Sequence, residues 1–255
     1  RKLVVIFFFI IVAFVLVLNI KKRESATTIV NFSTSMGAPE YWEYKLMMSN
    51  DDDANRLKKY EKIYNSNIYS EQAKQQIPKI IHQIWLGPKH PPEYFEEYRR
   101  SWLEKQPDWE WKLWTDKEAA LFDMELRSEF NASHNWGEKS DIFRAEILDR
   151  MGGLYVDVDF ECIQSFDQLA RKLDFFAGIE PPHIGITPKS EPRLTISNAI
   201  IGSCPGHPII KKWKQLIKKK WEALEAQMPD CKQRVLERTF YTFGEAIFSC
   251  IEDPN

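Results

Sequence analysis

Residues 152–159 read Gly152-Gly153-Leu154-Tyr155-Val156-Asp157-Val158-Asp159, and they decide how the chain is interpreted. Two glycines precede a short apolar run, as in a turn that leads into a buried strand, and two acids one residue apart follow it. Because successive side chains of a strand alternate between its faces, Tyr155, Asp157 and Asp159 are expected on one face. Carboxylates this close repel each other unless a cation lies between them, and oxygen ligands favour Mg²⁺ or Mn²⁺.

A bare D-x-D pattern also fits a strand that runs out into a solvated acidic turn, so the preceding segment matters. Residues 138–151 (EKSDIFRAEILDRM) predict a helix, because apolar residues recur at helical spacing and Gly152 supplies a stop. Asp141 and Arg144 lie three residues apart near its start, on neighbouring parts of its surface. Alone they would be an ordinary ion pair of the first turn, but beside the acid pair they could form one cluster.

Four blocks, in order, resemble the DXD-containing sugar transferases of glycosyltransferase family 32, a resemblance that covers roughly residues 77–212. That family includes the yeast initiating α-1,6-mannosyltransferase and inositol-phosphoceramide mannosyltransferases, and the clostridial glucosylating toxins are more distant relatives. The matching blocks are 77–87 (IPKIIHQIWLG), 107–116 (PDWEWKLWTD), 139–161 (KSDIFRAEILDRMGGLYVDVDFE), and 197–200 (SNAI) with 205–208 (PGHP).

The resemblance implies a retaining transferase that moves a hexose from GDP-mannose or a UDP-hexose to a glycan or glycolipid acceptor. It implies that Asp157 and Asp159 hold Mn²⁺ (or Mg²⁺), with Asp159 the direct ligand, where a cation would stabilise the charge that develops on the departing diphosphate. Asp141 would accept hydrogen bonds from ribose or sugar hydroxyls, and Arg144 would contact the sugar and its phosphate linkage. These four residues are the predicted catalytic set.

The predicted nucleotide-sugar-binding residues are Trp85, Asp141, Arg144, Tyr155, Asp157 and Asn198. By the resemblance, Trp85 would stack on the nucleobase, but nine tryptophans are present and most must be core. Asn198 would contact sugar or metal, or would be an ordinary amide at a strand edge. No catalytic base or nucleophile stands out, and Glu161 and Glu180 are candidates by position only.

The order of elements after residue 77 predicts an α/β domain. Strands alternate with helices, which indicates a mainly parallel sheet with helices on both faces and a ligand site beyond the carboxyl ends of the strands. The resemblance implies a Rossmann-like GT-A fold over residues 77–255; because residues 238–244 lack the family's Gly-Pro turn, its C-terminal closing segment is expected to be absent, replaced or lost. The expected strands are 79–86, 109–114, 175–179 and 196–201, and the expected helices are 93–105, 117–123 (capped by Asp116) and 207–227.

The N-terminus predicts a membrane anchor. Residues 3–20 form an apolar run with basic flanks, about 27 Å long as a helix, and no small-x-small cleavage site follows, so residues 1–23 favour an uncleaved signal anchor. Residues 24–76 are expected to form a stem, with an acidic run, 51–53, in a loop or helix cap. The resemblance implies a single-pass type II protein of the Golgi or ER lumen; a bacterial or viral membrane-associated enzyme fits the sequence almost as well.

Composition argues against several other classes. The net charge is −2 and the short run at 218–220 is the main basic cluster, so no nucleic-acid partner is expected. The five histidines lack zinc spacing, and the four cysteines are too dispersed for a disulfide scaffold. A haloacid-dehalogenase-type phosphatase would need Thr or Val where Glu161 stands. A non-catalytic, membrane-tethered scaffold or sugar-nucleotide-binding protein, and a transferase that binds its donor without transfer, remain open.

Overall fold

The computed structural model describes residues 32, 45, 48–69, 76–180, 194–227 and 231–252, which fall into two compact units. In the smaller unit (residues 1–72 and 181–194), helix α3 (Asp51–Ile68) begins at Asn50, whose side chain accepts a hydrogen bond from the Asp53 N–H (3.1 Å). The acidic run thus forms the first turn of a helix, where negative charge is favourable. Asp53 also accepts a hydrogen bond from the Leu194 N–H (3.1 Å).

The predicted anchor, residues 3–20, lies outside the described residues. Among the helices that the structure describes, none combines the length and the apolar character needed to cross a membrane.

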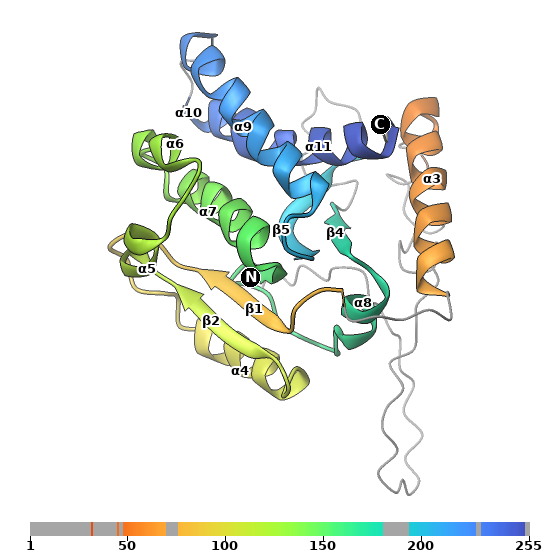
Figure 1. Cartoon of the computed structure of the whole chain (residues 1–255), viewed down its shortest axis with the longest axis horizontal. Helices are drawn as coiled ribbons and strands as arrows, with labels where there is room; N and C mark the ends of the chain where they lie inside the picture. Colours follow the sequence, from red (N-terminus) through yellow and green to blue (C-terminus); the bar gives the residue numbers. More distant parts are fainter. Residues whose placement is uncertain are drawn as a thin grey trace, which may run out of the picture. The chain divides into compact units, whose positions relative to one another are not determined.

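The larger unit (residues 73–180 and 195–255) contains a five-stranded sheet in the order β2-β1-β3-β5-β4 (Figure 1). β1 pairs in parallel with β2 and β3, whereas β5 pairs antiparallel with both β3 and β4. Four strands therefore run in one direction and β5 runs against them. Most strands are thus parallel, as expected, but the sheet is mixed, because β5 pairs directly with the strand before it instead of crossing over. The strands are β1 (Ile80–Ile84), β2 (Glu110–Trp114), β3 (Gly153–Val156), β4 (Phe175–Ile179) and β5 (Ile196–Ser203).

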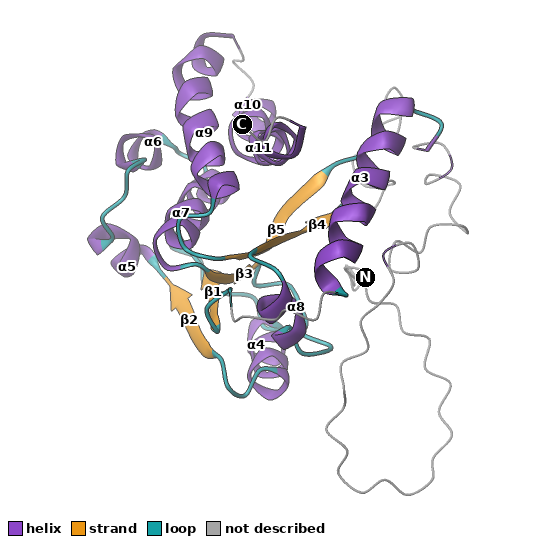
Figure 2. Cartoon of the chain, turned by 45° about the vertical axis from the view of Figure 1, so that its right-hand side comes forward, coloured by secondary structure: helices purple, strands orange, loops and turns teal. Residues whose placement is uncertain are grey.

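Helices cover both faces of the sheet, as predicted. Trp111 of β2 packs against Phe95 of α4 (ring centroids 6.4 Å apart), and Trp114 packs against Phe143 of α7 (5.5 Å). Figure 2 shows α4 and α7 on opposite sides of β1 and β2. The helices are α4 (Phe95–Lys105), α5 (Asp116–Leu121), α6 (Arg127–Ala132), α7 (Trp136–Met151), α8 (Asp167–Lys172), α9 (Pro208–Gln227), α10 (Cys231–Val235), the π-helix η1 (Leu236–Phe240) and α11 (Tyr241–Glu252).

One expectation about the helices was wrong in detail. Thr115, not Asp116, caps α5: its side chain and that of Glu118 form a capping box with each other's backbone N–H groups. In the C-terminal segment, α11 packs against α9 through the rings of Phe243 and Trp213 (4.7 Å).

The paired glycines are required by the turn from α7 into β3. Gly152 and Gly153 have φ values of +63° and +98°, and a Cβ on Gly153 would lie 2.8 Å from Nε2 of His82. His82 is fully buried: its Nδ1 accepts a hydrogen bond from the Trp114 indole (3.1 Å), and its Nε2 lies 2.9 Å from the Gly152 carbonyl. His82 is therefore neutral, with its proton on Nε2, and joins β1, β2 and this turn.

We expect the free energy of unfolding to fall as the pH is lowered through this histidine's titration range. Burial lowers the pKa of His82 from 6.5 to about 4, so between these values the unfolded chain binds a proton that the folded chain does not. The stabilisation is present above pH 6.5 and is lost toward pH 4, a change of roughly 3 kcal/mol.

Urea denaturation at pH 7, 6 and 5 tests this expectation. In His82→Gln, the free energy of unfolding should change much less between pH 7 and pH 5 than in the wild type. His207→Gln is the control: the pKa of His207 is also lowered by burial, but its ring is only partly buried, so the variant should keep most of the slope. Equal slopes in the wild type and His82→Gln would contradict the assignment.

Candidate functional site

A cavity of about 470 Å³ lies beyond the carboxyl ends of β1 and β3, where the sequence predicts a ligand site. Its wall combines aromatic and apolar side chains with one arginine and two acids. An aromatic and apolar surface suits a nucleobase, and the charged groups suit phosphates and a cation. The lining residues are Ile84, Trp85, Leu86, Pro88, Lys89, Tyr94, Trp136, Gly137, Ser140, Arg144, Tyr155, Asp157, Val158 and Asp159.

Arg144 is the centre of the charged cluster. The side chain is only 5% exposed, and Nη2 lies 2.9 Å from Oδ1 of Asp141 and 3.3 Å from Oδ1 of Asp157. Its guanidinium lies 4.2 Å above the Tyr155 ring, and Nη1 donates to the Asn198 carbonyl (2.5 Å). Burial disfavours the charge, but Tyr155 and the carboxylates outweigh it and raise the pKa of Arg144, so the residue stays cationic.

Asp141 does not line the cavity but supports Arg144 from its own helix. Oδ1 forms the ion pair with Arg144 and accepts a hydrogen bond from Nδ2 of Asn198 (3.1 Å), and Oδ2 accepts one from the Thr239 hydroxyl (2.5 Å). Burial raises the pKa of Asp141, and Arg144 and Thr239 oppose that rise. Thr239 was missed by sequence reasoning, because nothing in its local sequence connects it with a residue 98 positions earlier.

The acid pair lies just after β3, not within it. β3 ends at Val156, and a turn follows in which the Phe160 N–H donates to the Asp157 carbonyl (3.3 Å). Strand alternation therefore does not place Asp159, contrary to the expectation, yet both acids line the cavity. Tyr155 and Asp157 do share a side, as predicted, because the Tyr155 hydroxyl donates to Oδ1 of Asp157 (2.5 Å).

The two acids differ in their partners. Asp157 is tied to Arg144 and Tyr155, whereas Asp159 is exposed and makes no ion pair with any residue that the structure describes. Although the residue as a whole is exposed, partial burial of its carboxyl group and the neighbouring charge of Asp157 raise the pKa of Asp159. A divalent cation would relieve this repulsion, so the acids fit a cation that takes its other ligands elsewhere. Among the described residues, no cluster of three or more acidic, histidine or cysteine side chains could hold a metal by itself.

Trp85 lines the cavity as a partly buried side chain whose indole N–H donates to the Lys89 carbonyl (2.6 Å), so it is not one of the core tryptophans. Asn198 is buried and makes its contacts with Asp141 and Arg144 rather than with the cavity. Of the two acids suggested by position, Glu161 is exposed, while Glu180 hydrogen-bonds to Ser197 and has a pKa raised by burial and by Asp157.

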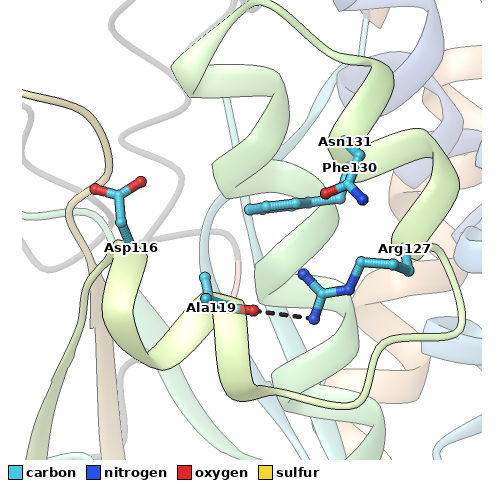
Figure 3. Close-up of a pocket in the computed structure, with 6 residues that line it drawn as sticks. Asp116, Ala119, Arg127, Phe130 and Asn131 are labelled. Carbon is cyan, nitrogen blue, oxygen red and sulfur yellow. Dashed lines mark hydrogen bonds between the residues drawn. The ribbon is translucent and has the colours of Figure 1, made fainter.

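A second cavity, of about 360 Å³, lies between α5 and α6 (Figure 3). Nη2 of its arginine, Arg127, donates to the carbonyls of Ala119 (3.0 Å) and Phe122. Its one acid, Asp116, accepts a hydrogen bond from the Gly87 N–H (2.9 Å). These charged groups stabilise loops and do not form an acid pair, so the chemistry is assigned to the first cavity.

Residues 92–176, which include the acid pair and Arg144, match the family model described as "Glycosyltransferase sugar-binding region containing DXD motif". This part of the chain is similar to the sugar-binding region of DXD-containing glycosyltransferases. This finding confirms the resemblance seen in the sequence, and Asp157-Val158-Asp159 is the DXD motif of the matched region.

Curated relatives agree with this relationship. The chain is 32% identical over 158 residues to inositol phosphoceramide mannosyltransferase 3 of Schizosaccharomyces pombe. The aligned region covers 60% of this chain and 40% of that protein. It is 34% identical over 142 residues to mannosyl phosphorylinositol ceramide synthase SUR1 of Saccharomyces cerevisiae, covering 54% and 34%. The chain thus spans about two fifths or less of the length of these relatives.

The fold is similar to that of a solved structure, PaToxG Glycosyltransferase, with a TM-score of 0.51 and 20% identity over 83% of this chain and 80% of that one. At this identity the likeness concerns the fold. It supports an α/β architecture of the glycosyltransferase kind, with the mixed sheet described above.

Proposed function

We propose that the chain is a metal-dependent, retaining glycosyltransferase that moves a hexose from a nucleotide sugar to a glycan or glycolipid. The observation that carries the proposal is Asp159, which makes no ion pair with the described residues, beside Asp157 and Arg144 in a cavity at the carboxyl ends of the strands. The two yeast relatives are named as a mannosyltransferase and a mannosyl phosphorylinositol ceramide synthase, and these names favour mannose as the sugar and a glycolipid as the acceptor.

Each part of the cavity has a role in this reaction. Asp157 and Asp159 would hold Mn²⁺ or Mg²⁺, which when bound stabilises negative charge on the departing diphosphate. Arg144 adds a fixed positive charge that needs no reorganisation, because Asp141, Asp157 and Tyr155 already hold it in place. Trp85 offers an aromatic surface for the nucleobase.

Asp141 and Asn198 are proposed to act on the donor through Arg144, which they hold from behind the cavity wall. The contact of Asn198 with both Asp141 and Arg144 connects β5 with α7, and so fixes the cluster from two elements. Tyr155 stabilises the orientation of Asp157 through its hydroxyl. We propose no catalytic base. Glu180 does not line the cavity, so it is not added to the predicted catalytic residues Asp141, Arg144, Asp157 and Asp159.

We also infer an organisation in which residues 1–23 anchor the protein, residues 24–76 form a stem and residues 77–255 form the catalytic domain. A membrane anchor would hold the cavity close to a glycolipid acceptor. A type II orientation in the Golgi or ER lumen is the arrangement that the family resemblance supports.

The proposal is tested by incubating the full chain with Mn²⁺ and GDP-mannose, UDP-galactose or UDP-N-acetylglucosamine. We expect release of free nucleotide from one donor, loss of that release in excess EDTA, and recovery when Mn²⁺ is restored. Saturable donor binding without release, measured by calorimetry, would favour the non-catalytic alternative. No binding of any donor would reject both functions.

A further inference from the structure

The C-terminal segment contributes a side chain to the acid cluster that sequence reasoning did not assign. Thr239 lies in η1 and is fully buried, and its hydroxyl donates to Oδ2 of Asp141 (2.5 Å). The same hydroxyl lies 3.0 Å from the Val235 carbonyl, but it carries one hydrogen. The shorter contact with a charged acceptor is the stronger of the two.

The segment that carries Thr239 is held firmly in place. The Trp213 indole of α9 donates to the Thr239 carbonyl (2.9 Å), and Arg238 donates to the Trp221 carbonyl (2.6 Å). Nη1 of Arg238 also lies 3.7 Å from Oε1 of Glu138 on α7. η1 is thus fixed to α9 and to α7 at once, and short π-helical segments of this kind are frequent at functional sites.

Asp141 links Thr239 to the cavity. Its Oδ1 forms an ion pair with Nη2 of Arg144 (2.9 Å) and accepts a hydrogen bond from Nδ2 of Asn198 (3.1 Å), while its Oδ2 accepts the hydrogen bond from Thr239. Arg144 lines the cavity, whereas Asp141 lies behind it. The Thr239 hydroxyl therefore acts on the cavity through Asp141 and Arg144.

We infer that Thr239 is a positioning residue: its hydroxyl fixes the carboxylate of Asp141, and Asp141 in turn holds the Arg144 guanidinium at the cavity. The inference rests on the proposed function, and it makes the C-terminal segment a support of the donor site.

The experiment compares Thr239→Val, which keeps the volume and removes the hydroxyl, with Thr239→Ser, which keeps the hydroxyl. Thr242→Val is the matched control: Thr242 is fully buried in α11, and its hydroxyl donates to the Arg238 carbonyl (2.6 Å), lies 3.1 Å from the Thr239 carbonyl and accepts from the Trp213 indole (3.2 Å). Among the hydrogen bonds of the described residues, the carboxylate of Asp141 is bound by Thr239 and not by Thr242. We expect kcat/KM for donor cleavage to fall about 10- to 100-fold in Thr239→Val, the effect of one hydrogen bond to a charged group. Thr239→Ser should retain most of the wild-type kcat/KM, because it keeps the hydroxyl. Thr242→Val should lose thermal stability without a comparable loss of kcat/KM.

A second measurement does not depend on catalysis. A ¹³C NMR titration of the Asp141 carboxyl group should show a higher pKa in Thr239→Val than in the wild type or Thr242→Val, because a donor to the ionised form is lost while Arg144, Asn198, Glu138 and Asp157 stay. An unchanged titration, or equal losses of kcat/KM in both valine variants, overturns the inference. If the wild type cleaves no nucleotide sugar, the proposed function fails by itself. In that case, a raised pKa of Asp141 in Thr239→Val would still confirm the hydrogen bond between Thr239 and Asp141, but this bond would not belong to a donor site.

Discussion

Replacing Asp159 by alanine is expected to lower the rate of donor cleavage by about a thousandfold, the scale of losing a cation that stabilises the leaving group. Asp159 is the acid of the pair without an ion-pair partner among the described residues, so its charge is free for a cation. The fold should not suffer, because the side chain is exposed and its removal relieves the repulsion that raises its pKa.

Nucleotide release at saturating Mn²⁺, together with thermal unfolding, measures both effects in Asp159→Ala. Glu161→Ala is the matched control: it removes an exposed acid two residues further along the same loop, and should keep near-normal release. If Asp159→Ala releases nucleotide at the wild-type rate, the acids do not hold a catalytic cation. Equal losses in the two variants would indicate a general effect of charge at this edge of the sheet.

Replacing Arg144 by methionine is expected to cost about 3–5 kcal/mol of folding free energy, the range for removing one partner of a buried ion pair. The buried carboxylate of Asp141 and the partly buried one of Asp157 would face each other without the guanidinium that separates them. Because burial already raises the pKa of Asp141, the variant should protonate this group readily, and the loss should shrink as the pH is lowered toward 5.

Urea denaturation at pH 7 and pH 5 measures the loss. Arg150→Met is the matched control on the same helix: Arg150 is 50% exposed and pairs with an exposed Asp123, so the expected loss is below about 1 kcal/mol. Donor cleavage should be abolished in Arg144→Met and retained in Arg150→Met. A similar loss of stability in both variants would show that Arg144 is not the electrostatic centre of the cluster.

Local patterns carried most of what could be predicted from the sequence. Helix α7 and strand β3 were recognised because helical spacing, the glycine pair and the apolar run are signals within a few residues. The cluster of Asp141, Arg144 and Asp157 followed from the same stretch, and the structure brings these residues into contact.

What the sequence could not predict depends on contacts between distant residues. The direction of β5 was not visible, because an apolar strand has the same composition whichever way it runs. The turn at Asp159 replaced the expected strand, and no local signal distinguishes the two. The roles of His82 and Thr239 depend on partners far away in the sequence. His82 contacts the Gly152 carbonyl, and Thr239 donates to the Asp141 carboxylate.

The central place of β5 also constrains the order in which the chain can fold during synthesis. β5 pairs with β3 on one side and with β4 on the other, so neither of those strands has this neighbour until residue 203 has emerged from the ribosome. The pairing of Gly153 with Ser203 closes a loop of about 50 residues, which is a slow step compared with local contacts. A nascent chain that ends before this strand exposes two unsatisfied strand edges, the kind of surface on which unfinished chains aggregate.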